Sequence, residues 1–372
     1  MSADHRLESL DVFRGATVAA MILVNNPGDW GAVFPSLLHS GWNGCTAADV
    51  IFPFFVFIMG CAMPFAFARR GARTDDRSRG VARIARRAAT LVALGLVLNL
   101  AAALPHIGAM RVPGVLQRLG LAFLVTALLV RSLSATTQGL VAIALLLGHW
   151  ALLTLVSFGP DAAAAVAPAH NLAGYIDAQV FGLHTLTPGF DPEGILGTAP
   201  TVATALIGAL AGQWLRRHDD ERSQLQGLVL GGVAAVGVGL AWSASWPLNK
   251  PLWSGSYALV TSGLAAVTLA ACLYVVDVRG ARRWARPFVW LGVNPLAIYF
   301  CSELVGHLID RPVMAGAVGK VALKDWVYWR VFARVGGTVS GEWPSLAYAI
   351  LFVACWVGAS ALLHRRGIRV RV

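Results

Sequence analysis

The residues of this chain with the clearest chemical potential lie just before an apolar segment. The stretch HSGWNGCTAAD carries His39, Trp42, Asn43 and Asp49, and the apolar run VIFPFFVFIMG follows at once. Polar side chains beside hydrocarbon are costly unless they face protein, water or a ligand. His39 is the one of the four that exchanges a proton near neutral pH. It is either a general base or nucleophile at an outer cavity, or an ordinary histidine in a solvated loop.

Two acidic motifs stand at the starts of apolar runs. Thr46 and Asp49 form a T-A-A-D pattern that is typical of a capping box. A second role for Asp49, the orientation of His39, requires the loop to fold back. Asp191 and Glu193, in the sequence DPEG, predict another helix start, with Asp at the cap and Pro in the first turn. The alternative is that these two carboxylates hold a cationic amine at an outer cavity.

Ionisable and amide groups also occur within or beside the apolar runs. Arg118 and Glu303 are expected to face a cavity or to pair with each other, because an isolated charge is unfavourable in a membrane. The amides of Asn25, Asn99 and Asn294 either bond to neighbouring helices or contribute to a site.

The composition indicates that these residues belong to a membrane protein. Hydrophobic residues make up 57% of the 372 residues and charged residues 13%, which is more apolar surface than a soluble domain hides. The runs are long enough for helices and lack the alternation of barrel strands. We therefore expect one all-α polytopic domain, residues 1–372, built as a bundle of about ten transmembrane helices, with the first run retained rather than cleaved. The predicted spans are 11–31, 49–68, 88–104, 114–130, 138–157, 195–215, 225–243, 257–276, 288–308 and 345–363.

The basic residues favour one orientation of this bundle. With the N-terminus inside, 22 of the 30 lysines and arginines fall in cytoplasmic segments and 7 in outer ones, as the positive-inside rule predicts. The net charge of +11 is therefore interpreted as topology rather than nucleic-acid binding. Both termini are predicted to be cytoplasmic, and His39 to lie on the outer side. Arg83 and Arg87, at the cytoplasmic start of the third span, are either topology markers or phosphate ligands.

The cysteines and the longest outer segment have simpler interpretations. The five cysteines are odd in number, contain no CxxC pair and are expected to be inert thiols, and no metal site is predicted. Soluble catalytic signatures such as GxSxG and HExxH are missing. Segment 309–344 is predicted to contain an interfacial helix with basic residues on one face, the alternative being a role in substrate binding. Those basic residues are Lys320, Lys324, Arg330 and Arg334.

Seven motifs keep their order over nearly the whole chain. They are RLESLDVFRG (6–15), HSGWNGCTAADVIFPFFVFIMG (39–60), RVPGVLQRLG (111–120), AGYID (173–177), DPEGILGT (191–198), PLNKPLWSGSY (247–257) and LGVNPLAIY (291–299). Together they resemble the heparan-alpha-glucosaminide N-acetyltransferase family of transmembrane acyltransferases and its bacterial relatives.

The resemblance implies an enzyme that takes an acetyl group from cytoplasmic acetyl-CoA and delivers it to a sugar amine across the membrane. His39 matches the active-site histidine of the family, Asn25 a polar residue near that centre, and Arg87 a basic residue at the cytoplasmic entrance. The lysosomal members carry a further lumenal domain and span that this chain is expected to lack. The expected setting is a bacterial inner membrane with a periplasmic glucosamine-type acceptor, and a homodimer is a further expectation.

The motifs and the resemblance together give a full set of expected site residues. The expected catalytic residues are His39 and Asn25. The expected contacts to acetyl-CoA are Arg83, Arg87, Asn99 and Asn294. The expected substrate contacts are Asn43, Asp49, Arg111, Asp191, Glu193, Asn249 and Lys250. The expected partners are the amino sugar, acetyl-CoA and the lipid bilayer.

Two mechanisms and two other functional classes remain open at this point. His39 acts as a base during direct transfer, which we favour, or it is acetylated first and passes the group on. In both, a basic cytoplasmic mouth holds the anionic nucleotide while the slim pantetheine arm enters the bundle. The alternative to an enzyme is an inner-membrane transporter of N-acetylglucosamine or an amino sugar. Transporters often have paired repeats with broken helices, and no such pair is found in the sequence, although Gly292, Asn294 and Pro295 could break the ninth span. A structural subunit leaves the polar residues of the spans unexplained.

Overall fold

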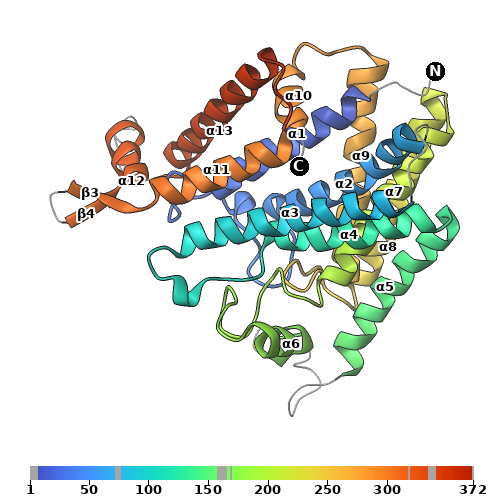
Figure 1. Cartoon of the computed structure of the whole chain (residues 1–372), viewed down its shortest axis with the longest axis horizontal. Coiled ribbons are helices and arrows are strands. Elements are labelled where there is room, and N and C mark those ends of the chain that lie inside the picture. The colour runs from blue at the N-terminus through green and yellow to red at the C-terminus, as the bar shows by residue number, and fades with distance from the viewer. Residues whose placement is uncertain are drawn as a thin grey trace. The chain divides into compact units, whose positions relative to one another are not determined.

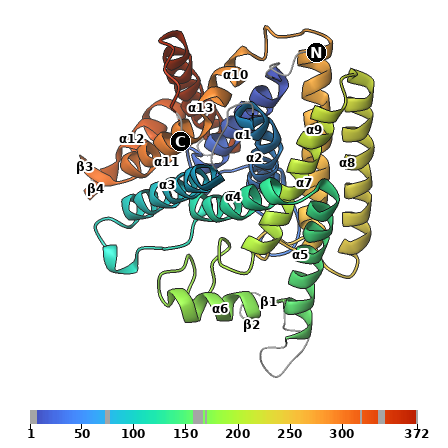
Figure 2. The same ribbon diagram turned by 45° about the vertical axis from the view of Figure 1, so that its right-hand side comes forward.

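The computed structural model describes residues 7–71, 77–156, 166–167, 170–316, 319–333 and 341–370. These residues are mainly helical, with two small antiparallel hairpins, β1–β2 (Val166–Ala167 and His170–Asn171) and β3–β4 (Pro312–Gly316 and Gly319–Ala322). Figures 1 and 2 show the helices from two directions. The longer helices are α1 (Glu8–Asn25), α2 (Ala47–Gly71), α3 (Arg77–Ala103), α4 (Val115–Ser132), α5 (Ala135–Leu155), α6 (Leu172–Phe181), α7 (Thr198–Arg217), α8 (Glu221–Ser243), α9 (Gly255–Cys272), α10 (Arg286–Val293), α11 (Pro295–Ile309) and α13 (Glu342–Arg365).

The helical membrane architecture predicted from the sequence is confirmed. Among the described residues, seven helices are long and apolar enough to cross a membrane, namely α2, α3, α4, α5, α8, α9 and α13. The pair α10–α11 adds an eighth candidate, bent by 87° at the break that Asn294 and Pro295 were predicted to cause. α1 and α7 overlap two further predicted spans, with 18 and 20 residues. α1 begins with charged residues and α7 is rich in Thr, Gly and Ala, so both are less apolar than the seven.

The chain divides into two compact units, which are described separately below. Unit 1 comprises Met1–Leu10, Ser40–Cys45 and Phe52–Gly280, and unit 2 comprises Asp11–His39, Thr46–Ile51 and Ala281–Val372. The boundary crosses the chain near His39, so that the loop after this histidine belongs to unit 1 and the start of α2 to unit 2. The expectation that residues 1–372 act as one domain stays a prediction.

Small residues allow the helices of unit 1 to pack closely. Gly232 of α8 and Gly263 of α9 face each other so tightly that a Cβ atom on either one would overlap the backbone carbonyl of the other. α8 and α9 accordingly run side by side in Figure 2. Gly60 of α2 and Gly208 of α7 make the same kind of approach between those two helices. Such contacts are typical of helix pairs in membranes, where backbone proximity replaces the hydrophobic driving force.

Unit 2 is held together by a similar approach and by its C-terminal segment. Gly15 of α1 lies against the carbonyl of Phe288 in α10, where a Cβ atom would overlap it. At the break between α10 and α11, the amide of Asn294 donates to the carbonyl of Ile368 (3.0 Å) and accepts the N–H of Val370 (2.9 Å). The chain after α13 is thereby fixed to the bent span.

The described part of segment 309–344, which follows α11, differs from the single interfacial helix that was predicted. Lys320 lies in strand β4, and a short helix, α12 (Leu323–Val327), and a π-helical turn (Tyr328–Phe332) come after it. Glycines end β3 and begin β4, and glycine disfavours a helix. Lys324 is buried and pairs with Asp310 at 2.7 Å, so it does not share an exposed basic face. Arg334 lies outside the described residues.

Candidate active site

His39 and Asp49 form a hydrogen-bonded pair in unit 2. His39 Nδ1 lies 2.9 Å from Asp49 Oδ1, and the side chains are 53% and 0% exposed respectively. Asp49 is the third residue of α2, and its Oδ2 accepts the backbone N–H of Thr46 (3.0 Å). The loop therefore does fold back, and Asp49 both caps α2, as T-A-A-D predicted, and contacts the histidine.

The Asp49 carboxylate determines which ring nitrogen of His39 carries the proton. A carboxylate oxygen accepts hydrogen bonds, so Nδ1 is the protonated nitrogen of the neutral ring and Nε2 is its proton acceptor. The carboxylate is fixed by α2 itself, because the Thr46 N–H donates to Oδ2 and the Thr46 hydroxyl lies 3.1 Å from the same oxygen. The arrangement is suited to a general base that a buried carboxylate orients and whose positive charge it stabilises.

A second polar contact of unit 2 joins α1 to α11. Asn25 Nδ2 donates to Glu303 Oε1 at 3.0 Å, so the last residue of α1 meets the ionisable residue of the broken span. Next to it, Gly306 lies so close to Asn26 Oδ1 that a Cβ atom would overlap it. Glu303 therefore has an amide partner within its own unit, and its pairing with Arg118 stays a prediction.

A cluster of charged side chains in unit 1 joins the loop before α4 to the turn before α7. Arg111 Nε donates to Asp191 Oδ2 at 2.7 Å, and Arg111 Nη2 donates to both Asp191 Oδ1 and Glu193 Oε2. Burial lowers the pKa of Arg111, but the hydrogen bonds and charges of the two carboxylates outweigh it and raise that pKa above its ordinary value. Three of the predicted substrate residues are thus brought together, although Arg111 precedes Asp191 by 80 positions and Glu193 by 82.

The helix start predicted at Asp191 is wrong. α7 begins at Thr198 with Gly197 as its cap, and Asp191 lies in a turn before it. The Asp191 carboxylate accepts the N–H groups of Leu186 and Glu193 (both 2.9 Å) in addition to the guanidinium. Pairing with a remote arginine overrides the local preference of Asp and Pro for a helix start.

Asp177 and Arg118 hold this turn through hydrogen bonds to its backbone. Asp177 accepts the N–H of Asp191 (3.3 Å) and of Ile195 (3.0 Å). Burial raises the pKa of Asp177 to about 6, although the two N–H groups act in the opposite direction. Arg118 Nη2 donates to the carbonyl of Gly194 at 3.0 Å, and its guanidinium lies 5.5 Å from the centre of the Trp253 ring.

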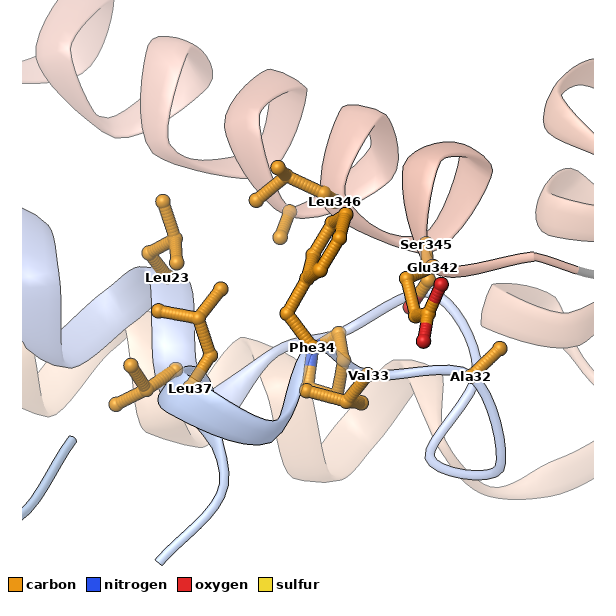
Figure 3. A pocket seen from close by; sticks show the side chains of 11 residues that line it. Leu23, Ala32, Val33, Phe34, Leu37, Glu342, Ser345 and Leu346 are labelled. Atoms are coloured by element: carbon orange, nitrogen blue, oxygen red, sulfur yellow. The ribbon is translucent and has the colours of Figure 1, made fainter. Parts of the chain in front are cut away.

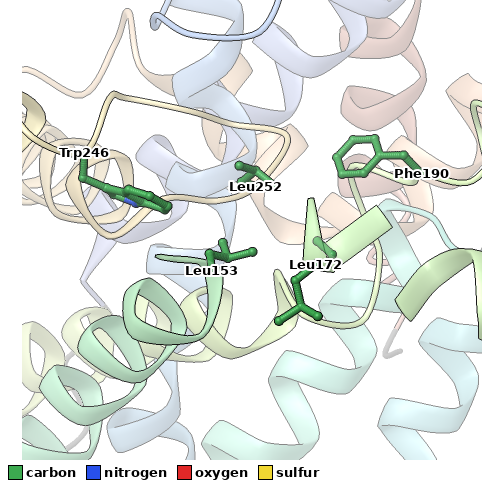
Figure 4. Close-up of a cluster of buried hydrophobic side chains, with 6 residues drawn as sticks. Leu153, Leu172, Phe190, Trp246 and Leu252 are labelled. Atoms are coloured by element: carbon green, nitrogen blue, oxygen red, sulfur yellow. The ribbon is translucent and has the colours of Figure 1, made fainter. Parts of the chain in front are cut away.

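The loop that follows His39 is attached to two other loops of unit 1. Asn249 Nδ2 donates to Asn43 Oδ1 at 3.0 Å, and Gly44 N–H donates to the carbonyl of Leu248 at 2.8 Å. The Trp42 and Phe190 rings meet edge to face with centres 5.3 Å apart. Below them, Figure 4 shows Leu153, Leu172, Phe190, Trp246 and Leu252 gathered in one apolar cluster. This cluster gives the three loops a common base.

Trp253 is the most constrained residue of these loops. Its φ of 54° is in the left-handed region, which is unfavourable for a residue other than glycine. The side chain is 1% exposed, and its indole N–H donates to Thr204 Oγ1 at 3.1 Å. The Lys250 carbonyl accepts the Trp253 N–H (2.9 Å), so the predicted substrate residue Lys250 belongs to the same turn.

The residues of unit 1 that were expected to contact acetyl-CoA lie toward opposite ends of α3. Arg83 and Arg87 lie near the start of α3, where Arg83 Nε donates to the carbonyl of Arg79 and the Arg87 guanidinium stands 4.6 Å from the centre of the Phe123 ring. Asn99, near the end of the same helix, donates to the carbonyls of Arg111 and Pro113 (both 2.8 Å). Asn294 belongs to unit 2, where its amide holds the C-terminal segment.

One cavity of unit 2 is very small. It lies among α1, the short turn Pro35–Leu37 and α13, where Figure 3 shows Leu23, Phe34 and Leu346 around it. Its volume of about 10 Å³ holds no more than one water molecule. Within the described residues, no group of three or more His, Cys, Asp or Glu side chains is placed to bind a metal ion.

The comparison with known proteins agrees with the motifs. A family model described as "heparan-alpha-glucosaminide N-acetyltransferase, catalytic" matches residues 6–238. The chain belongs to this family. It is 29% identical over 358 residues to heparan-alpha-glucosaminide N-acetyltransferase of Homo sapiens, which covers 81% of this chain and 52% of the human protein. The protein of the same name from Mus musculus is 28% identical over 360 residues, with 82% and 54% covered. The chain thus spans about half the length of the curated relatives that it matches.

The family model matches the part of the chain that contains the His39–Asp49 pair and the charged cluster around Arg111. The matched region includes His39, Asp49, Arg111 and Asp191, whereas Glu303 and Asn294 lie beyond it. Asp177 was not among the predicted site residues, although this carboxylate closes the AGYID motif. Trp253 was not predicted to have a special role, because a tryptophan side chain carries no signal of a left-handed backbone.

Proposed function

We propose that this chain transfers an acetyl group from acetyl-CoA on the cytoplasmic side to the amine of a glucosamine-type sugar on the outer side of a bacterial inner membrane. The observation that carries the proposal is the His39–Asp49 pair at the start of α2, because it supplies an oriented base within a family named for N-acetyl transfer. The curated relatives carry that activity in their names. The transporter alternative has no comparable support from the comparisons.

The proposed topology has ten spans with both termini in the cytoplasm. It counts the seven apolar helices, the bent pair α10–α11, and the less apolar α1 and α7. The bias of arginine and lysine supports this orientation, since the clusters fall at alternate ends of the spans. His39 then lies on the outer side and Arg87 on the inner side.

His39 performs the proton transfer in this proposal. As the amine nitrogen of the acceptor attacks the thioester carbonyl, Nε2 removes one of its protons. The new C–N bond forms, the C–S bond breaks, and the proton held by His39 is released to the thiolate or to water. Asp49 keeps Nδ1 protonated and stabilises the imidazolium without taking the proton itself. An acetyl-histidine intermediate is the competing mechanism.

For the donor, Arg83 and Arg87 are the strongest candidates to bind the nucleotide phosphates. Both guanidinium groups are at the end of α3 that the proposed topology places inside, and arginine pairs well with phosphate. Asn99 and Asn294 bond to backbone carbonyls in this structure, so a contact with acetyl-CoA requires those bonds to exchange. The proposal also requires a passage from Arg87 to His39 for the pantetheine arm.

The acceptor is proposed to bind at the outer loops of unit 1. These loops combine amides, carboxylates and aromatic rings, the groups that recognise a polar sugar. The proposed contacts are Asn43, Asn249, Lys250, Arg111, Asp191 and Glu193, with Asp49 acting through His39. A homodimer in the membrane is proposed as the assembly.

The replacement His39→Ala tests the proposal in proteoliposomes loaded with labelled acetyl-CoA. We expect acetyl transfer to external glucosamine to be lost while acetyl-CoA still binds. His106→Ala removes an exposed histidine of an outer loop and serves as the matched control. Near-normal transfer by His39→Ala refutes the assignment. Labelled acetyl trapped on His39 without acceptor overturns direct transfer, and uptake of labelled sugar without acetyl-CoA favours the transporter.

A further inference from the structure

The charged cluster of unit 1 contains more acid than base. Asp177, Asp191 and Glu193 supply three carboxylates, and Arg111 and Arg118 supply two guanidinium groups, all on the outer loops or directly below them. With every group ionised, one negative charge is left over. A partly buried excess of one charge favours the binding of an additional cation.

The two carboxylates that hold Arg111 are unequally supported. Asp191 is fully buried and receives both Nε and Nη2 of Arg111, together with two backbone N–H groups. Glu193 shares Nη2 with Asp191, so one nitrogen serves two carboxylates. The Arg111 and Glu193 side chains are 22% and 10% exposed, which places this half of the contact at the edge of the cluster.

A second observation points to a ligand with oxygen acceptors. Arg118 is 1% exposed and bonds to the Gly194 carbonyl, next to Glu193, through Nη2. Its Nε and Nη1 atoms have no hydrogen-bond partner within the described part of the chain. Buried N–H groups of a guanidinium without an acceptor are costly, so an oxygen-bearing partner belongs beside them.

We propose that the Arg111 guanidinium occupies the place at Glu193 that the ammonium group of the acceptor takes when the sugar binds. A cationic amino sugar displaces the guanidinium from Glu193, and hydroxyl oxygens of the same sugar accept the N–H groups of Arg118. Asp191 keeps its hold on Arg111 during this exchange, so the arginine moves aside without leaving the cluster. Neutral sugars lack the charge to make the exchange, which makes Arg111 and Glu193 the residues that select amino sugars. The inference rests on the proposed function for the identity of the acceptor.

The surroundings of Glu193 are consistent with a sugar ligand. The half-buried Trp42 ring packs edge to face on Phe190, the residue before Asp191, and the exposed part of an aromatic ring offers an apolar surface to a sugar ring. The exposed Asn43 amide, bonded through its oxygen to Asn249, directs its N–H groups away from that bond. Both features belong to unit 1, as does the charged cluster.

Equilibrium binding without acetyl-CoA tests the inference separately from catalysis. We measure the binding of glucosamine and of glucose to the full chain in nanodiscs by calorimetry. Glu193→Gln keeps the two-point contact between Arg111 and Asp191, and we expect it to weaken glucosamine binding by about 10-fold or more, because a charge-assisted hydrogen bond is lost. Arg111→Lys keeps the charge but loses the two-pronged geometry, so the lysine competes less and glucosamine binds more tightly. We expect the affinity of both variants for glucose to stay within about 2-fold of the wild-type value, because glucose carries no charge.

Opposite shifts in the two variants support the inference. It is overturned if Glu193→Gln binds glucosamine as the wild type does, if both variants weaken it alike, or if the wild type does not prefer glucosamine to glucose. Glu221→Gln, at an exposed position at the start of α8, is the matched charge control. His39→Ala and Glu193→Gln together separate the two proposals. Loss of transfer with intact glucosamine binding in His39→Ala leaves the proposed exchange at Glu193 standing. Unchanged glucosamine binding by Glu193→Gln overturns that exchange and leaves the catalytic assignment of His39 untouched.

Discussion

Residues 46–49 and 191–194 carry similar helix-start chemistry and end in different roles. The first, T-A-A-D, lies at the start of α2, where Asp49 caps the helix and holds His39. The second, D-P-E-G, precedes α7 by several residues, and its carboxylates bind Arg111 instead. Asp49 binds a histidine ten positions before it, whereas Asp191 and Glu193 bind an arginine 80 and 82 positions before them. A local cap preference is kept when the partner of the side chain lies close by in the chain, and it is lost when a remote guanidinium supplies a stronger bond.

The largest effect is expected at the first motif. Asp49→Asn presents an amide N–H₂ to His39, which favours the tautomer with the proton on Nε2 and removes the base. We expect the rate of acetyl transfer to fall by about 10²–10⁴-fold, while α2 keeps an oxygen acceptor at its start. Steady-state assays in proteoliposomes measure the rate, and circular dichroism follows the fold. A rate within a factor of three of the wild type would show that Asp49 only caps the helix.

The next effect concerns stability at the second motif. Arg111→Met leaves the buried Asp191 and Glu193 carboxylates without their cation, and we expect the free energy of unfolding to fall by about 3 kcal/mol. Glu193→Gln should cost much less, because Asp191 retains the two-point contact. Thermal unfolding in nanodiscs compares the two variants. Equal losses would mean that Glu193, rather than Asp191, anchors the arginine.

Asp177, which hydrogen-bonds to the second motif, predicts that the stability of this turn depends on pH. Burial raises the pKa of Asp177 to about 6 in the folded protein, above the 3.8 of an ordinary aspartate. The folded state therefore binds this proton more tightly, so the stabilisation is full below pH 3.8 and is lost as the pH rises through about 6. Hydrogen exchange of residues 186–195 should quicken from pH 5 to pH 7.5 beyond the intrinsic rate change. Asp177→Asn should abolish that extra change, and its persistence would assign it to another group.

The smallest effect returns to the cap of α2. Thr46→Ala removes the hydroxyl that lies near both Asp49 Oδ2 and the Leu38 carbonyl, but it keeps the backbone N–H that Asp49 accepts. We expect a loss of about 1 kcal/mol in stability and a change of only a few fold in transfer. Unfolding and transfer measured on the same preparation give both values. A loss of transfer as large as that of Asp49→Asn would make Thr46 part of the orienting network.

Patterns along the chain were sufficient for much of the fold. Apolar runs of about 20 residues predicted the helices, because a membrane demands internally bonded backbone over that length. Asn294 and Pro295 predicted the broken span, since proline lacks the N–H that a continuous helix needs. The same patterns failed for Lys320, because glycines flank the hairpin and helical periodicity alone ignores them.

The sites were predictable to the extent that their residues carry chemistry in one short segment. His39, Asp49 and Thr46 lie within ten residues, so the loop and cap were visible in the sequence. Asn43 and Asn249 are 206 positions apart, and Asn25 and Glu303 are 278 apart. Motif order placed these residues in one family, but no local rule states which amide meets which partner.

The sequence by itself determined that this is a multi-span helical membrane protein of the N-acetyltransferase family with a histidine in the loop before its second helix. Hydropathy and motif order are properties of the chain, and they need no folded partner to be read. The tertiary structure alone decided that Asp49 faces His39, that Arg111 bridges Asp191 and Glu193, and that Asp177 and Arg118 hold the turn beneath them. These pairings depend on which groups are buried together, because a hydrogen bond or charge pair gains strength only when folding removes both partners from water.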